Sequence, residues 1–204
     1  MEKIDFKKDM KTLYKAPING FAFVKVPALK YLMVDGAGDP NTVPAFEASI
    51  ETLYGVAFTM KFSAKKAGVG PEYTVAPLSG LWWCEGMEGF DLDSKDMWRW
   101  TLMIAQPSFI ENEMVPSAVL QLVEKGKQGL WDRIRLETLD EGLSVQTMYI
   151  GPYSDEAPTI AAMNSFILEK GYSPRGMHHE IYLSDPRRTV PEKLKTIIRH
   201  PVSK

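Results

Sequence analysis

Two spacings of hydrophobic positions alternate along the chain. In some segments apolar residues recur at every second position, and in others at every third or fourth. The first spacing is typical of a strand with one buried face, and the second of a helix with one buried stripe. Clusters of Gly, Pro, Asp and Asn separate these segments, as is usual at turns. The pattern therefore predicts a mixed fold of strands and amphipathic helices.

The predicted elements occur in the same order in both halves of the chain. Those of the first half are an extended lead-in over 1–17, a β run over 21–34, a turn over 35–41, a helix capped by Asn41 or Thr42 that ends by 68–71, strands over 72–75 and 78–85, an exposed connection over 85–96, and a strand over 98–104. Those of the second half are a helix over 116–127, strands over 134–137 and 142–150, a turn over 151–155, a helix over 156–169 ended by Gly171, and strands over 178–183 and 196–202.

This repeated order predicts two similar units within one domain. In each half a β run ends in a turn, and a helix and two strands follow. We expect a single domain over 1–204, with a first unit over about 20–105 and a second over about 112–202. Two such units can pair their sheets and leave a groove between them, which is a common place for a ligand.

Charge and cysteine content narrow the range of partners and compartments. The 204 residues carry a formal net charge of -2, so no pull toward nucleic-acid phosphates is expected. The basic pairs at 65–66 and 187–188 are interpreted as solvated faces. Neither a membrane span nor a signal peptide is expected. The single cysteine, Cys84, excludes an intrachain disulfide and favours a reducing cytoplasm.

Aromatic and methionine residues are abundant. The chain has 5 Trp, 8 Tyr, 9 Phe and 11 Met, a supply of flat and polarisable surface that suits small-molecule sites. The same residues also fill ordinary cores, so the count does not by itself identify a pocket.

Glu180 is the main candidate for chemistry. Strand alternation places it on one face with His178 and Tyr182, whereas Ile181 and Leu183 take the other face, which we expect to pack against a helix. A carboxylate beside aromatic walls attracts a cationic or polarised ligand, and desolvation enables such a group to act as a general base near neutral pH. A solvent-facing Glu on a half-buried strand is the alternative.

Tyrosine and tryptophan side chains are the other candidates, each with a packing role as its alternative. Tyr149 is a candidate catalytic hydroxyl that flanks a Gly-Pro turn, and a packed anchor is equally expected there. The candidate ligand-binding residues are Tyr73, Trp82, Trp98, Trp100, Tyr153, His178 and Tyr182. Trp82 and Trp83 are adjacent on a strand, so only one of them can line a given pocket.

Other chemical motifs are incomplete. His178 and His179 are direct neighbours, and His200 is alone in the tail, so no metal site is expected. Gly36 and Gly38 lack the further glycine of a dinucleotide-binding fingerprint. Cys84 lies on an apolar strand and is interpreted as an inert core thiol. We expect no cofactor.

Several segments together resemble the GyrI-like small-molecule-binding family. In the second half these are Tyr149-Ile150-Gly151-Pro152-Tyr153, Glu169-Lys170-Gly171-Tyr172 and His179-Glu180-Ile181-Tyr182-Leu183-Ser184-Asp185-Pro186. The first half resembles a stand-alone branch through Asp35-Gly36-Ala37-Gly38-Asp39-Pro40-Asn41, Leu53-Tyr54 and Pro77-Leu78-Ser79-Gly80-Leu81-Trp82-Trp83.

The resemblance implies an α+β fold and a ligand site. The fold would be two strand-helix-strand-strand units with pseudo-twofold symmetry, with antiparallel sheets flanking a central ligand groove that Glu180 faces. The stand-alone branch is similar to cyclopropanoid cyclopropyl hydrolases, which open the strained ring of DNA-alkylating compounds.

The expected function is therefore capture of planar aromatic xenobiotics in an aromatic pocket, with hydrolysis of reactive cyclopropanes as detoxification. One alternative is a non-catalytic drug-binding or sensor protein for flat, often cationic ligands. Another is a gyrase-modulating interaction protein, although no protein partner is expected. No helix-turn-helix segment is expected either, which argues against a transcription regulator.

Overall fold

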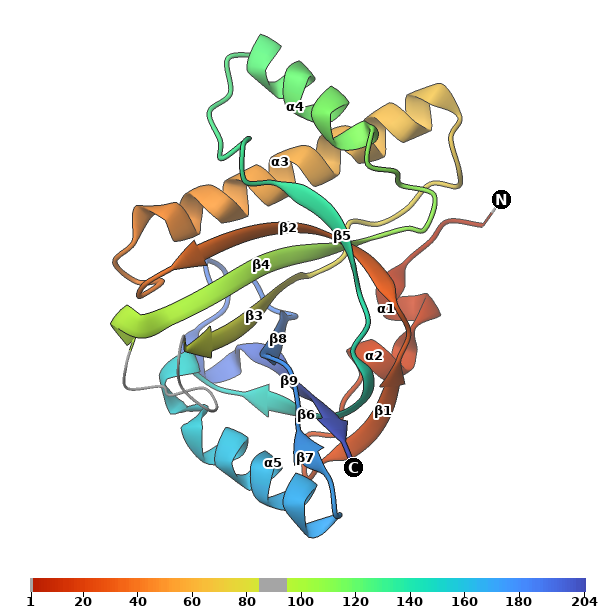
Figure 1. Ribbon diagram of the computed structural model, residues 1–204. Coiled ribbons are helices and arrows are strands. Elements are labelled where there is room, and N and C mark those ends of the chain that lie inside the picture. Colours follow the sequence, from red (N-terminus) through yellow and green to blue (C-terminus); the bar gives the residue numbers. More distant parts are fainter. Residues whose placement is uncertain (1, 85–94) are drawn as a thin grey trace.

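The computed structural model describes residues 2–84 and 95–204 (Figure 1). The helices are α1 (Phe6–Asp9), α2 (Lys11–Tyr14), α3 (Pro44–Ala67), α4 (Met114–Glu124) and α5 (Ala157–Glu169). The strands are β1 (Ala22–Val26), β2 (Leu29–Ala37), β3 (Leu78–Cys84), β4 (Trp98–Gln106), β5 (Arg135–Leu139), β6 (Gly142–Ile150), β7 (Ser173–Pro174), β8 (His178–Tyr182) and β9 (Lys195–Ser203). Most of the predicted connection over 85–96 lies outside the described residues.

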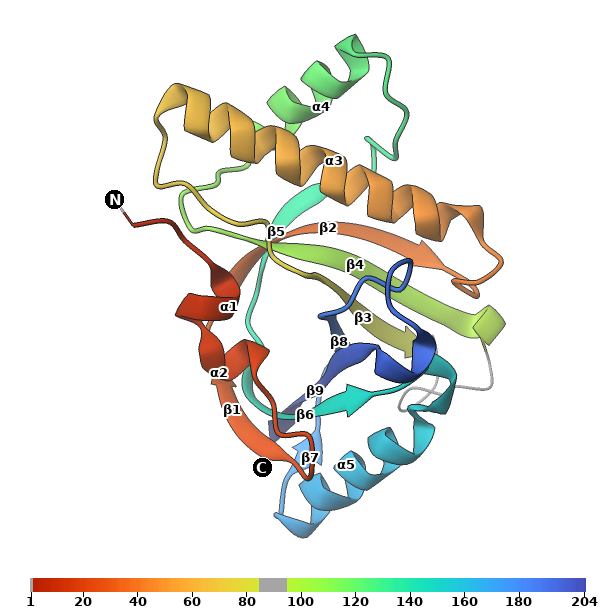
Figure 2. The same cartoon turned by 180° about the vertical axis from the view of Figure 1, so that it is seen from behind.

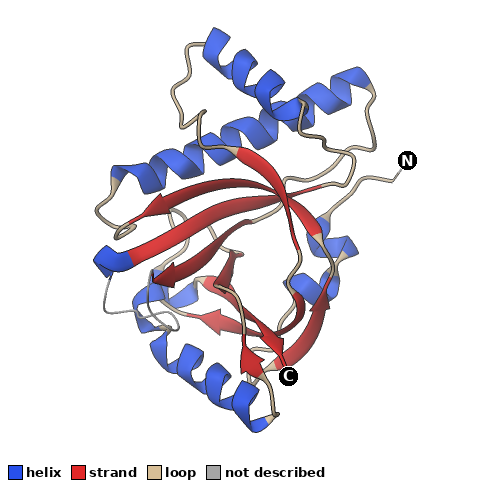
Figure 3. Ribbon diagram, in the orientation of Figure 1, coloured by secondary structure: helices blue, strands red, loops and turns tan. Residues whose placement is uncertain are grey.

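The described strands form one curved antiparallel sheet in the order β1-β6-β9-β8-β3-β4-β2-β5, with β7 paired to β9 (Figure 3). From the central β3–β8 pair outward, one side reads β3, β4, β2 and the other reads β8, β9, β6. The elements β2-α3-β3-β4 and β6-α5-β8-β9 thus follow the same path on either side of the centre. The predicted α+β fold with pseudo-twofold symmetry is confirmed.

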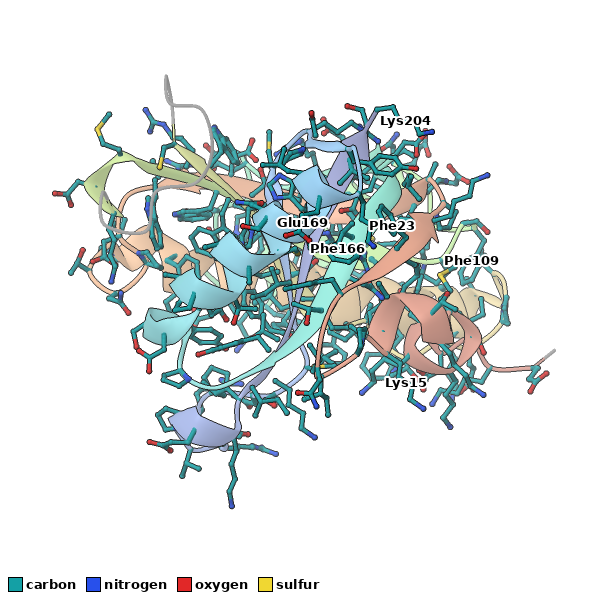
Figure 4. The ribbon with its side chains drawn as sticks, turned by 90° about the horizontal axis from the view of Figure 1, so that it is seen from below. Lys15, Phe23, Phe109, Phe166, Glu169 and Lys204 are labelled. Atoms are coloured by element: carbon teal, nitrogen blue, oxygen red, sulfur yellow. The ribbon has the colours of Figure 1, made fainter. Side chains whose placement is uncertain are left out.

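The two outer strands of the sheet tie these halves together. β1 precedes β2 in the chain but pairs with β6 of the other half. Likewise, β5 precedes β6 but pairs with β2. Phe23 of β1 also contacts Phe166 of α5, with ring centroids 5.8 Å apart (Figure 4). The halves are therefore joined at both edges of the sheet as well as at its centre.

The two longest helices cover the same face of the sheet. α3 crosses β2 and β4, while α5 runs along β6 (Figures 1 and 2). α3 ends at Gly68, whose φ of 67° is a left-handed conformation that glycine adopts without strain. The predicted cap was wrong: the helix begins at Pro44, and Thr42 bonds the Asp39 carbonyl instead of a helix N–H. Among the described residues, no helix is both long and apolar enough to cross a membrane.

Three other local predictions were wrong. The lead-in contains α1 and α2, which at four residues each are too short to show a helical period. The β run over 21–34 is divided at Pro27, which has no N–H to donate to a sheet, into β1 and β2. The predicted strand over 72–75 is reduced to one bridge between Tyr73 and Ile4.

A buried charged network lies on the sheet face opposite α3 and α5. Glu141 accepts from Nδ1 of His179 at 2.8 Å and from Nη1 of Arg199 at 3.2 Å. Arg199 also donates to Oε1 of Gln146 and, at 2.7 Å, to the carbonyl of Leu13 in α2. This network fastens the lead-in to β8 and β9.

Gly36 is required by the packing of α3 on the sheet. A Cβ there would lie 2.0 Å from the side chain of Trp100, which is fully buried and packs edge-on against Phe46. We predict that Gly36→Ala lowers the free energy of unfolding by about 1–3 kcal/mol, because the crowded ring cannot move away. Gly55→Ala is the matched control: its Cβ would make an ordinary 3.6 Å contact in a helix, so stability should not fall. Denaturant unfolding measures both, and a Gly36→Ala protein as stable as wild type would contradict the packing.

The Glu141 network should dominate acid stability. Burial alone would raise the pKa of Glu141, but the charges and hydrogen bonds of His179 and Arg199 lower it to about 2. The contribution of ionised Glu141 to the free energy of unfolding is thus complete at pH values above its ordinary pKa of 4.5, and it is lost as the pH falls toward 2. We predict that Glu141→Gln lowers the free energy of unfolding by about 3–5 kcal/mol at pH 7. The stability of this variant should also depend less on pH between 4.5 and 2 than that of the wild type.

The matched control for this variant is Glu137→Gln. Glu137 is paired with Arg135 at 3.0 Å but is exposed, so its replacement should change stability little. Urea unfolding at several pH values compares the two, and equal small effects would show that the buried network is not a stabilising element.

Candidate functional site

The candidate site lies on the central β3–β8 pair, on the face that carries α3 and α5. Gly80 pairs with Glu180, and Trp82 pairs with His178. Cross-strand partners share a face, so Trp82, His178 and Glu180 point the same way, as alternation predicted for the residues of β8. The other face of β8 carries Ile181, which packs with residues of the lead-in rather than against either long helix.

Glycine at position 80 makes room for the centre of the site. A Cβ there would lie 2.9 Å from Nε1 of Trp82 and 3.2 Å from the hydroxyl of Tyr182. Without it, the indole N–H of Trp82 donates to the Tyr182 hydroxyl at 3.0 Å across the strand pair. Trp82 is buried beside the site, and its neighbour Trp83 points to the opposite side and is half-buried.

Glu180 is buried, with 7% of its surface exposed, and accepts hydrogen bonds from three side chains. Nε2 of His178 lies 3.1 Å from Oε1 of Glu180. The Tyr182 hydroxyl and the carboxyl of Glu156 lie beside it, close enough to interact as a second and a third donor. A carboxylate has about four acceptor positions, so about one remains for a ligand or a water molecule.

Glu156 is the functional residue that sequence reasoning missed. It is the residue before α5 and is 1% exposed. Burial, together with the charge and hydrogen bond of Glu180, raises its pKa to about 10. In the sequence it is simply the acidic start of a helix, where negative charge is favourable. The turn over 151–155, which aims it at Glu180, is the only signal that could have revealed it.

Glu156, His178 and Glu180 each offer a ligand atom, and these atoms lie within 4.8 Å of one another. That spacing alone would suit a cation. Hydrogen bonds inside the group already account for it, however, because Glu180 bonds both His178 and Glu156. We therefore assign no metal to these residues.

Aromatic rings surround the carboxylate. Trp82 contacts Trp98 edge-on at 5.5 Å and Phe46 of α3 at 5.9 Å. Tyr153, in the turn before α5, stands edge-on to Tyr182 at 5.7 Å and is 37% exposed. The sequence did not single out Phe46. Trp100 is on the same face but is fully buried beneath Phe46. It therefore has the packing role that was the alternative to ligand binding.

The two tyrosines near Glu180 keep their protons. Burial and the nearby charge of Glu180 raise the pKa of Tyr182 well above its usual value and that of Tyr153 to about 12. Both hydroxyls therefore remain hydrogen-bond donors at neutral pH.

The sequence suggested that His200 stands alone, but in the structure it lies beside His178. Its ring centroid lies 6.2 Å from that of His178, and burial followed by the charge of His178 lowers its pKa to about 4. It is therefore neutral at physiological pH.

Tyr73 and Tyr149 contact residues other than Glu180. Tyr73 is buried against Phe109, at a ring distance of 5.8 Å. The Tyr149 hydroxyl donates to the Pro152 carbonyl at 2.9 Å and lies over Gly151, where a Cβ would be 2.6 Å away.

Tyr149 also lines an open groove of about 490 Å³ between β6, α5 and the loop before β1. The groove is lined by no charged side chain, so we place the chemistry at Glu180. Its lining residues are Ile18, Asn19, Gly20, Phe21, Thr147, Met148, Tyr149, Ile150, Pro158, Thr159 and Ala162.

The arrangement suits the binding of a small molecule beside a buried carboxylate. The partly exposed ring of Tyr153 offers a surface for stacking, and Glu180 supplies negative charge and a basic oxygen. These are also the parts of a site in which a carboxylate activates water beside a bound aromatic compound.

Two solved structures of similar sequence share this architecture, and a third of distant sequence shares the fold. An uncharacterized conserved protein from Listeria innocua is 39% identical, with a TM-score of 0.90 over 98% of this chain and 100% of that one. A hydrolase from Listeria innocua is 38% identical, with a TM-score of 0.89 over 99% and 100%. The C-terminal domain of EcmrR, 15% identical over 91% of this chain and 98% of that one, shares the fold with a TM-score of 0.56.

No curated protein matches the chain. The family model for the GyrI-like small molecule binding domain matches residues 21–203, which include every strand and both long helices. The chain therefore belongs to the GyrI-like family of small-molecule-binding domains.

Proposed function

We propose that this protein captures planar aromatic xenobiotics around Glu180 and hydrolyses reactive cyclopropane-containing DNA alkylators among them, as a detoxifying hydrolase. The observation that carries the proposal is a buried carboxylate that is bonded to His178 and walled by Trp82, Phe46 and Tyr153. The hydrolase from Listeria innocua, which matches along almost the whole chain, supports hydrolysis as the reaction class. Because the chain has one cysteine, Cys84, and can form no intrachain disulfide, we place this activity in the reducing cytoplasm.

The proposed reaction joins water to a strained ring conjugated with a carbonyl group. The water oxygen bonds to a ring methylene carbon, and the bond from that carbon to the conjugated system breaks. The electron pair of this bond moves to the carbonyl oxygen, and the proton of the attacking water moves to Glu180. The resulting enolate or phenolate then takes a proton from solvent, and Glu180 returns its proton to solvent, so that the product is the substrate plus one water and the carboxylate is regenerated.

Each step of this reaction has a side chain that can assist it. Glu180 accepts the proton, for which one acceptor position remains. A tyrosine hydroxyl, from Tyr153 or from the sequence candidate Tyr149 after it leaves the Pro152 carbonyl, donates to the developing oxyanion. Tyr182 is already bonded to Glu180 and keeps that carboxylate oriented. General-base assistance of this kind typically contributes about 10²–10⁴-fold to the rate.

A ligand reaches Glu180 by displacing the outer aromatic ring. Glu180 itself is nearly enclosed, whereas Tyr153 is exposed at the rim on a short turn. We therefore expect Tyr153 to turn outward on binding and then close over the ligand.

Binding without chemistry is the second candidate. It is favoured by the negative charge at Glu180 beside aromatic faces, which attracts flat cations whether or not a water molecule is activated. Incubating a trace of the protein with excess cyclopropane-containing alkylator separates the two by mass spectrometry. Water-added product beyond one equivalent of protein establishes the hydrolase. Unchanged compound with quenched tryptophan fluorescence establishes binding alone.

Glu180→Gln should remove turnover far more than it weakens ligand binding. The amide keeps the shape of the side chain but takes up no proton, so we expect a loss of about 10²-fold or more in kcat. Glu169→Gln is the matched control, since Glu169 is exposed at the far end of α5 (Figure 4) and should have no effect. Full turnover by Glu180→Gln would remove Glu180 from the catalytic role.

Tyr182→Phe tests the support of Glu180 rather than its chemistry. The variant removes the donor to Glu180 and the acceptor of the Trp82 indole N–H. We predict a free energy of unfolding lower by about 1–3 kcal/mol, together with reduced turnover. The indole N–H resonance of Trp82 should also shift in an NMR spectrum. An unshifted resonance with wild-type stability would show that the Trp82–Tyr182 bond contributes nothing.

A further inference from the structure

We propose that Glu156 is a positioning residue that carries one proton in its hydrogen bond to Glu180 and so holds the pair at a single negative charge. The shared proton follows from the geometry of the two carboxyl groups. Its effect on turnover rests on the proposed function, and the experiments below separate the two.

The contact between the carboxyl groups requires a proton. Glu156 and Glu180 are 1% and 7% exposed, and an oxygen of each carboxyl group lies within 4.8 Å of one of the other. Two ionised carboxylates this close and this buried would repel each other, so one of the two groups is protonated. Two unit charges 4 Å apart would repel by about 4 kcal/mol even at an effective dielectric constant of 20.

The partners of each group place this proton on Glu156. Glu180 also accepts from His178 and from Tyr182, and both bonds stabilise its ionised form. Glu156 has no such donors, and its Oε1 is buried without a hydrogen-bond partner among the described residues. Although Glu156 precedes α5, its side chain does not cap the helix and reaches Glu180 instead.

The other titratable groups around Glu156 leave this assignment intact. They are Tyr149 on β6, Tyr153 and Asp155 in the turn before α5, His178 and Tyr182 on β8, and His200 on β9. The tyrosines keep their protons, and His200 is neutral at physiological pH. The charge that acts most directly on Glu156 is therefore that of Glu180.

This arrangement gives Glu156 two effects on ligand binding. It fixes one side of the Glu180 carboxylate, so that the remaining acceptor position points in one direction. It also limits the site to one negative charge, which matches a ligand with a single positive charge or a polarised neutral ring. A doubly charged cation would gain full compensation only by expelling the shared proton.

Infrared spectroscopy tests the proton without any substrate. At neutral pH the wild-type protein should show the carbonyl stretch of a protonated carboxylic acid, and Glu156→Gln should lack it. Glu169→Gln, at the exposed end of the same helix, should retain it. Absence of the band from the wild type, or its survival in Glu156→Gln, would overturn the proposal whether or not the protein is an enzyme.

The pair Glu156→Gln and Glu156→Ala tests positioning. An amide N–H can replace the donor of a protonated carboxyl group, so Glu156→Gln should keep near wild-type turnover or ligand affinity at pH 7. Glu156→Ala should lose about tenfold or more, the cost of a hydrogen bond to a charged group. Wild-type activity should also change in alkali as Glu156 ionises, and Glu156→Gln should not share this change.

Equal losses in the two folded variants would overturn the positioning role. Thermal unfolding establishes that each variant is folded. If Glu156→Ala does not fold, the pH profile of Glu156→Gln in alkali decides. An alkaline change in activity identical to that of the wild type would show that the change is caused by another group. If no protein turns over substrate, the proposed hydrolysis fails, while the infrared band still decides the shared proton.

Discussion

A carboxylate buried among aromatic rings needs hydrogen-bond donors, and the centre of this protein is built around that need at Glu180. The donors come from separate elements: His178 and Tyr182 from β8 and Glu156 from the start of α5. Trp82 of β3 holds Tyr182 in turn. The register of the central strand pair and the position of α5 are therefore both fixed by the surroundings of one side chain. A shift of either would leave Glu180 buried without compensation.

A second buried carboxylate, Glu141, lies on the opposite face of β8 and has different partners. Glu141 is compensated there by the full positive charge of Arg199, together with His179. That carboxylate is ionised, surrounded and closed to further partners. Among the described residues no arginine or lysine pairs with Glu180, so its negative charge is left for a ligand to balance. Strand β8 thus separates a structural carboxylate from a reactive one, with His179 and Glu180 as adjacent residues on opposite faces.

The sequence revealed what depends on local periodicity and little of what depends on distant packing. Alternation along β8 correctly grouped Glu180 with Tyr182, and the repeated order of elements predicted the two halves. Phe46 and Glu156 were missed because both lie at helix starts, and only the folded sheet brings them to β3 and β8. Tyr149 was predicted as a candidate catalytic hydroxyl with a packed anchor as the alternative, and the bond of its hydroxyl to the Pro152 carbonyl is a contact that no periodicity reports.

A crystal structure with a planar aromatic cation bound would locate the ligand site. We predict a ligand at Glu180, stacked between Phe46, Trp82 and an outward-turned Tyr153, with its positive region against the carboxylate. A ligand seated instead in the groove lined by Tyr149, with Glu180 still enclosed by its own partners, would contradict it.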